Sequence, residues 1–237
     1  MNKPLCSRAS FFALSLLGDT CKGADPAQAR ENYRRSLAIA RHLAEIWPED
    51  LQARWSLIVS LSNVASLLKY SDPGRALELY EESLDISREL AAQRSGDFRV
   101  RRDLSVSLDD VAGMLKHSDP GQALKLYRES LGIRRELAAQ RSGDFQARRD
   151  LTVALDNVAG MLKHSDPGQA LKLYRESHDI TRELAAQLPG NLQALWNLGV
   201  AAARLAQLLP AEDPERIPLW REAASSFRDA LGIQPEH

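Results

Sequence analysis

Cysteine is scarce in this sequence, which has only two cysteines, Cys6 and Cys21, among 237 residues. Neither of them belongs to a CxxC pair, so the sequence provides no disulfide framework and no paired metal motif. Scarce cysteine is typical of proteins that reside in a reducing compartment. We therefore expect a cytoplasmic protein.

An excess of charge of one sign is also absent. Lysine and arginine together number 31 and aspartate and glutamate 32, which gives a net charge of −1, and no basic tail is present. Without a long-range positive field, neither nucleic acid nor an anionic membrane surface is attracted. We expect no nucleic acid and no membrane among the partners.

Motifs that carry chemistry are missing as well. The sequence contains no GxGxxG, GxxxxGKS, GxxxxGKT, HExxH or GxSxG. His117 and His164 recur at one place near a predicted helix end, where an imidazole interacts favourably with the helix dipole. A metal site or a pH-sensing pair is the alternative for them, although no second type of ligand accompanies them. We expect no catalytic residue, no cofactor and no metal, and hence no enzyme.

The sequence does contain a regular internal repeat. Asp-Pro pairs begin at Asp25, Asp72, Asp119, Asp166 and Asp213, each 47 residues after the last. A fixed period of about 20 to 50 residues is typical of one supersecondary unit stacked many times, in which neighbours bury each other's apolar faces. We expect one repeat domain over residues 25–237, with repeats that start near these five residues.

The residue pattern within each repeat predicts two antiparallel helices. In the unit that starts near position 95, Leu104, Leu108 and Val111 recur at helical spacing and form one apolar face. Asp119 can then cap a second helix, and Pro120 suits the first helical position because it has no N–H to leave unbonded. An apolar stripe with small residues follows along this second helix.

Two places depart from the regular pattern. His178 takes the place of Leu84 and Leu131 in the second helix, and we expect a tolerated polar residue at the edge of the apolar stripe, with a functional site as the alternative. Residues 1–24 carry an apolar stretch whose Leu14 and Leu17 fall on first-helix positions of the repeat. We expect a degenerate N-terminal helix there. Export by a signal peptide is the alternative, but no small-residue cleavage site follows the stretch.

The second helix resembles that of the tetratricopeptide repeat family. The family's pattern of small, aromatic and branched residues is matched by Ala76, Leu77, Tyr80, Ser83, Leu84 and Ile86. The period of 47 exceeds the family's usual length of about 34 residues, as in the long repeats of bacterial multidomain regulators. The resemblance implies an all-α fold, a right-handed α-α superhelix of antiparallel helix pairs.

In that family the first helices line a concave groove, and the resemblance places three rows of residues there. These protein-binding candidates are Trp55, Val59, Arg102, Asp103, Val106, Arg149, Asp150, Val153, Trp196, Asn197 and Val200. Arginine can hold a carboxylate or a backbone carbonyl, and tryptophan can act as an anchor. The alternative is structural, with arginine–aspartate ion pairs between repeats and with the valines and tryptophans in the core.

The resemblance implies a non-catalytic scaffold that binds a protein or a peptide in the groove. Some family members clamp an acidic chaperone tail with lysine and asparagine, but Trp55, Val59, Arg102 and Val106 stand at those places, so a different ligand is expected. One alternative is an oligomerisation or regulatory module that self-associates through a final helix, expected at Pro218 to Ile233. The other is an RNA-binding helical repeat, for which a more basic groove is typical.

Overall fold

The structure is a computed structural model that describes residues 8–232. These residues contain ten helices and no strand. The helices are α1 (Arg8–Cys21), α2 (Pro26–Ile46), α3 (Leu51–Leu68), α4 (Pro73–Gln93), α5 (Phe98–Leu115), α6 (Pro120–Gln140), α7 (Phe145–Leu162), α8 (Pro167–Gln187), α9 (Leu192–Leu208) and α10 (Arg216–Leu231). Cys6 and the expected helix end at Ile233 lie outside the described residues.

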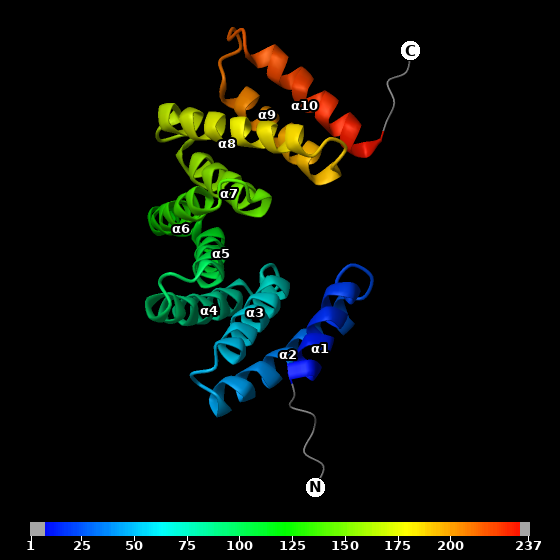
Figure 1. Cartoon of the computed structure of the whole chain (residues 1–237), viewed down its shortest axis with the longest axis vertical. Helices are drawn as coiled ribbons and strands as arrows, with labels where there is room; N and C mark the ends of the chain where they lie inside the picture. Colours follow the sequence, from blue (N-terminus) through cyan, green and yellow to red (C-terminus); the bar gives the residue numbers. More distant parts are fainter. Residues whose placement is uncertain (1–7, 233–237) are drawn as a thin grey trace. The chain divides into compact units, whose positions relative to one another are not determined.

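The helices follow one another as antiparallel pairs (Figure 1). We call α1, α3, α5, α7 and α9 the first helices, and α2, α4, α6, α8 and α10 the second helices. Contacts divide the chain into an N-terminal unit, Met1–Ala123, and a C-terminal unit, Leu124–His237. In the N-terminal unit each helix from α1 to α4 packs on the helix that follows it, and in the C-terminal unit each helix from α7 to α9 does so. The all-α fold of stacked helix pairs is therefore confirmed.

Aspartate and asparagine side chains begin these helices, as the sequence predicts. The backbone N–H of Arg75 donates a hydrogen bond to the carboxylate of Asp72 (3.0 Å), and a proline follows at the start of α4. The other capping residues are Asp25, Asp50, Asp97, Asp119, Asp144, Asp166 and Asn191. Each cap satisfies an N–H group that has no partner within the helix itself.

The last helix departs from this pattern. It begins at Arg216 instead of the expected Pro218, and Glu215 at its N-cap makes no side-chain capping bond. Asp213 accepts a hydrogen bond from the backbone N–H of Glu215 (2.9 Å), in the turn that precedes the helix. The fifth Asp-Pro pair therefore keeps its place in the sequence but does not cap a helix.

This difference predicts unequal effects for one and the same substitution. Asp72→Ala is expected to lower the free energy of unfolding by about 1 kcal/mol, because the N–H of Arg75 loses its acceptor. Asp213→Ala should change it by less than about 0.5 kcal/mol, because no helix loses its cap. Urea unfolding of the two variants measures the difference, and equal losses would contradict the capping assignment.

Small polar side chains allow the helices of the N-terminal unit to approach closely. The hydroxyl groups of Ser36 in α2 and Ser60 in α3 lie 3.2 Å apart, and those of Ser87 in α4 and Ser107 in α5 lie 2.9 Å apart. All four serines are buried. Within each pair the hydroxyl groups lie within hydrogen-bond distance of each other, so these four polar groups have partners although they are buried. Their small volume leaves the helix backbones close together.

Ion pairs join one second helix to the next. In each pair the arginine and the glutamate stand at equivalent places of the repeat, except that the glutamate of α10 is shifted by one residue. The pairs are Arg41–Glu82 (2.8 Å), Arg135–Glu176 (2.7 Å) and Arg182–Glu222 (3.0 Å). We call this series the arginine–glutamate ladder.

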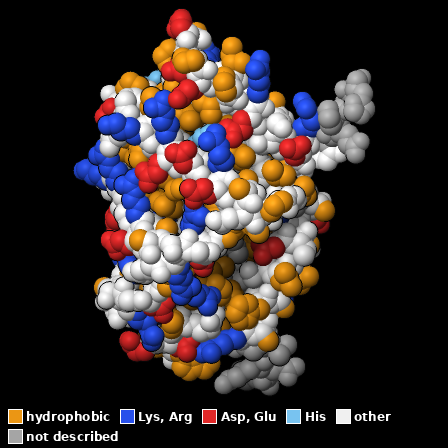
Figure 2. Space-filling view, turned by 45° about the horizontal axis from the view of Figure 1, so that its top comes forward, with side chains coloured by type: hydrophobic (Ala, Val, Ile, Leu, Met, Phe, Trp, Pro, Cys, Tyr) orange, Lys and Arg blue, Asp and Glu red, His pale blue; other side chains and the backbone are white. Residues whose placement is uncertain are grey.

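Charged side chains of both signs are interspersed with apolar ones over the face that Figure 2 shows. Among residues 8–232, no helix has the length and the apolar character needed to cross a membrane.

Candidate functional site

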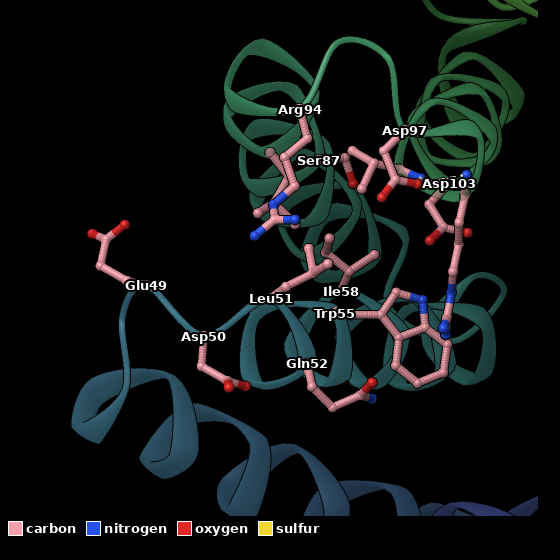
Figure 3. Close-up of a pocket in the computed structure, with 13 residues that line it drawn as sticks. Glu49, Asp50, Leu51, Gln52, Trp55, Ile58, Ser87, Arg94, Asp97 and Asp103 are labelled. Atoms are coloured by element: carbon pink, nitrogen blue, oxygen red, sulfur yellow. Dashed lines mark hydrogen bonds between the residues drawn. The ribbon is translucent and has the colours of Figure 1, made fainter.

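The N-terminal unit contains a pocket of about 380 Å³ between the first helices α3 and α5, with α4 behind it (Figure 3). Ile58, Leu90 and Val100 form a buried apolar cluster at its floor. We call it the N-terminal pocket, which is lined by Glu49, Asp50, Leu51, Gln52, Trp55, Ile58, Ser87, Leu90, Arg94, Asp97, Arg99, Val100 and Asp103. An apolar floor with a few polar groups around it is typical of ligand sites.

Trp55 lines the α3 side of this pocket. The guanidinium of Arg99 lies over its ring, 4.2 Å from the ring centroid, where the π electrons attract a cation. The ring of Phe12 lies 6.4 Å away. Burial raises the pKa of Asp103, although the guanidinium groups of Arg99 and Arg102 and a hydrogen bond from Trp55 oppose the shift. Trp55, Arg99 and Asp103 thus form one connected group beside the pocket.

The C-terminal unit contains a pocket of about 330 Å³ between the first helices α7 and α9. We call it the C-terminal pocket, which is lined by Arg149, Thr152, Val153, Asp156, Asn157, Thr181, Gln193, Trp196, Asn197, Val200, Ala201 and Arg204. Val153 and Trp196 remain 43% and 46% exposed, so apolar surface is open to a ligand. The structure brings together five candidates that the sequence places in the groove, namely Arg149, Val153, Trp196, Asn197 and Val200.

Trp196 and Arg149 offer complementary contacts in the C-terminal pocket. The ring of Trp196 packs against Phe227 of α10, with centroids 4.9 Å apart, and this contact fixes its position. The half-buried guanidinium of Arg149 makes no hydrogen bond and no ion pair within the described residues. Its five N–H donors can therefore serve a carboxylate or a backbone carbonyl of a ligand.

An ion pair between Asp156 of α7 and Arg204 of α9 joins the two first helices at this pocket. Burial raises the pKa of Asp156, and the adjacent guanidinium of Arg204 opposes the shift. The buried Oδ1 atom of Asp156 has no hydrogen-bond partner within the described residues. One carboxylate oxygen thus holds the two first helices together, and the other is buried within the protein.

The two pockets occupy equivalent places in the repeat, two periods of 47 residues apart. Trp55 in the first corresponds to Arg149 in the second, and Asp103 corresponds to Asn197. Each pocket lies between consecutive first helices and is backed by the second helix between them. A pocket at this place is therefore a property of the repeat, while its chemistry differs between the units.

Four residues that the sequence places in the groove line neither pocket. Val59 and Arg102 are half-buried and Val106 is exposed. Asp150 accepts a hydrogen bond from the side chain of Gln146, one turn earlier in α7 (2.6 Å). The Asp150 carboxylate is therefore engaged in a hydrogen bond within α7.

Sequence reasoning missed other residues of the two pockets. Asp156 had a usable signal, because Asp109 stands one period earlier at the same place of the repeat. Arg99 had none, since its equivalents are Gln146 and Gln193. The contact of Arg99 with Trp55 depends on residues that do not recur in the other repeats, so the repeat pattern could not predict it.

His178 corrects one expectation of the sequence. It is 3% exposed, which places it in the core and not at the edge of the apolar stripe. Its Nε2 lies 2.7 Å from the carboxylate of Glu222, because α10 brings this glutamate over α8. Burial opposes the charged form of Glu222, but hydrogen bonds from Arg182 and His178 outweigh it and hold the pKa of Glu222 below its ordinary value. The buried imidazole is therefore tolerated because the half-buried Glu222 carboxylate pairs with it.

These groups line a further pocket of about 610 Å³ between α8 and α10. Its charged groups are paired with one another, as Arg175 is with Glu215 (2.9 Å) and Arg182 with Glu222 (3.0 Å). The pocket therefore has a structural role between two helices, and we do not assign a ligand to it.

The histidines and the cysteine that remain from the sequence analysis line none of these pockets. His117 and His164 are exposed just after α5 and α7, and Cys21 is a half-buried free cysteine at the end of α1. Within residues 8–232, no group of three or more His, Cys, Asp or Glu side chains is placed to hold a metal ion.

Comparison with known proteins gives similarity at the level of solved structures. No protein-family model matches the chain, and no curated protein matches it. The chain is similar to MamA 41-end from Desulfovibrio magneticus RS-1, with 13% identity, 94% of each chain covered and a TM-score of 0.46. It is also similar to the S. pombe nuclear import adaptor Nro1, with 11% identity, 100% of this chain and 94% of that chain covered and a TM-score of 0.47. For a de novo designed helical repeat protein the identity is 19%, the coverage 77% and 96%, and the TM-score 0.44.

Proposed function

We propose that the protein is a non-catalytic scaffold that binds an extended peptide segment of another protein on the surface between its first helices. The observation that carries this proposal is the recurrence of one pocket in both units, between α3 and α5 and between α7 and α9. Each pocket combines apolar surface, a tryptophan and charged groups. Each pocket by itself suits a side chain of an extended peptide.

The chemistry of the C-terminal pocket supports a peptide ligand. Trp196 offers an exposed aromatic surface whose position is fixed by Phe227. Arg149 offers donors to a carboxylate or to a peptide carbonyl. Tryptophan and arginine are also the residue types that most often dominate the energy of protein interfaces.

Peptides selected from a random displayed library against the whole chain test the proposal. Arg149→Ala combined with Trp196→Ala is expected to weaken the selected peptides by at least about thirtyfold, because both anchors of the C-terminal pocket are lost. Arg149→Ala alone should weaken them by about tenfold and leave the melting temperature unchanged, since this side chain has no partner within the described residues. Fluorescence anisotropy of labelled peptides gives the affinities.

Trp47→Ala is the matched control. Trp47 is also an exposed tryptophan, 47% exposed, but it lines neither pocket. Selected peptides should bind this variant as they bind the unchanged protein. If no peptide is selected, or if the pocket variants bind as tightly as Trp47→Ala does, the proposed function is wrong.

A further inference from the structure

One face of α10 is not covered by another of the helices that the structure describes (Figure 1). Its residues are three or four positions apart and share one side of the helix, namely Ile217, Trp220, Ala224, Arg228 and Leu231. All five are exposed, and Leu231 is 63% exposed. We call this surface the α10 outer face. None of its residues lines the N-terminal or the C-terminal pocket.

Equivalent positions are buried in earlier second helices. Tyr174 and His178 of α8 stand 46 residues before Trp220 and Ala224, and both are buried. Ala185, which stands 46 residues before Leu231, is buried as well. The α10 outer face is therefore built like an internal face of the repeat, on which another helix packs, and not like a polar end.

The arginine–glutamate ladder ends at the same face with an arginine, Arg228, that has no ladder glutamate opposite it among the described residues. Arg228 stands 46 residues after Arg182, the arginine that pairs with Glu222 of the next second helix. Arg135 pairs in the same manner with Glu176. The guanidinium of Arg228 has no such carboxylate partner within residues 8–232. A helix that covers the face in the manner of the repeat would place a carboxylate against Arg228.

A second copy of this chain does not meet that requirement. If its first helix pair continued the stack, the position of α2 that is equivalent to Glu82 would face Arg228. That position holds Arg35, which is exposed. Two guanidinium groups would then face each other, and like charges across an interface disfavour association. Charge complementarity thus disfavours continuation of the stack by a second copy and favours a helix that carries an acidic residue at this place.

We propose that the α10 outer face docks an amphipathic helix of another protein. Apolar side chains of that helix cover Trp220 and Leu231, and an aspartate or glutamate pairs with Arg228. The chain then holds two partners on separate surfaces, one through its pockets and one through α10. Failure of either site leaves the other intact, because the two sites share no residue.

A segment of the chain itself serves as the probe. The synthetic peptide of residues 142–188 contains the α7–α8 pair with Glu176, the ladder glutamate, and it has no tryptophan. Titration into the whole ¹⁵N-labelled protein is expected to shift the indole N–H resonance of Trp220, which Trp220→Phe assigns. The same peptide with Glu176→Arg should bind about fivefold more weakly, as loss of one exposed ion pair implies.

Charge reversal on the protein makes the test reciprocal. Arg228→Glu should weaken the unchanged peptide about fivefold and restore binding of the Glu176→Arg peptide. Arg75→Glu, an exposed reversal in α4, is the control for long-range charge and should change neither affinity. The proposal would be overturned if the charge reversals left the peptide affinities unchanged. It would also be overturned if the Trp220 resonance did not shift. A concentration-dependent dimer in sedimentation velocity that Trp220→Asp abolishes would overturn it as well, because a second copy would then cover the face.

Discussion

Gly199→Val in α9 is expected to lower the free energy of unfolding of the C-terminal unit by about 3 kcal/mol. A Cβ atom at Gly199 would lie 2.7 Å from the ring of Phe227 in α10, closer than carbon atoms approach without a shift. Phe227 in turn packs on Trp196, 4.9 Å between centroids, so its displacement also disturbs the C-terminal pocket. Urea unfolding gives the loss, and hydrogen exchange of the α9 and α10 amides locates it.

The same substitution at Gly132 of α6 is the control. A Cβ atom there meets nothing within 4 Å. Because valine is a better helix former than glycine, Gly132→Val should raise stability by about 0.3 kcal/mol. A loss at Gly132 as large as that at Gly199 would show that the contact with Phe227 does not decide the outcome.

Glu222→Gln is expected to lower the free energy of unfolding by about 2 kcal/mol at neutral pH. Glu222 accepts a hydrogen bond from Nε of Arg182 (3.0 Å), and its carboxylate lies 2.7 Å from Nε2 of the buried His178. Loss of the negative charge weakens both contacts between α8 and α10. Glu215→Gln is the control, since Glu215 forms a single exposed pair with Arg175 (2.9 Å) and should change stability by less than about 0.5 kcal/mol.

The effect of Glu222→Gln should depend on pH with a defined sign. Burial raises the pKa of Glu222, but the hydrogen bonds from Arg182 and His178 outweigh burial and place this pKa below the ordinary 4.5. A carboxylate with a depressed folded-state pKa stabilises the fold above its unfolded-state pKa, and this contribution disappears as the pH falls through the folded-state value. The stability difference between the unchanged protein and Glu222→Gln should therefore be full above pH 4.5 and shrink below it. A difference that grows on acidification would contradict the assignment.

The helical fold was predictable because two signals coincide in every repeat except the last. Asp72 and its equivalents mark where second helices begin, and apolar residues such as Leu104 and Leu108 recur at helical spacing between those marks. Both signals are local, since capping and amphipathicity depend on neighbours in the sequence. The start of α10 was missed because Asp213 keeps the motif without capping the helix.

The candidate pockets were predictable only where their residues recur with the 47-residue period. Equivalent residues of a stacked repeat face the same surface, and this is why Arg149, Val153 and Trp196 meet in one pocket. The burial of His178 depends on a single glutamate of α10, and the contact of Arg99 with Trp55 has no counterpart in other repeats. Such contacts arise from the packing of particular helices, which the sequence pattern does not encode.

Photo-crosslinking tests the central claim, that the surface between first helices binds a peptide. Benzoylphenylalanine at position 153 replaces the exposed Val153 of the C-terminal pocket, and the same residue at position 172 replaces Lys172, exposed on α8 outside both pockets. We predict that a peptide selected against the whole chain is crosslinked from position 153 and not from position 172. Equal crosslinking from both positions, or crosslinking from position 172 alone, would contradict the claim.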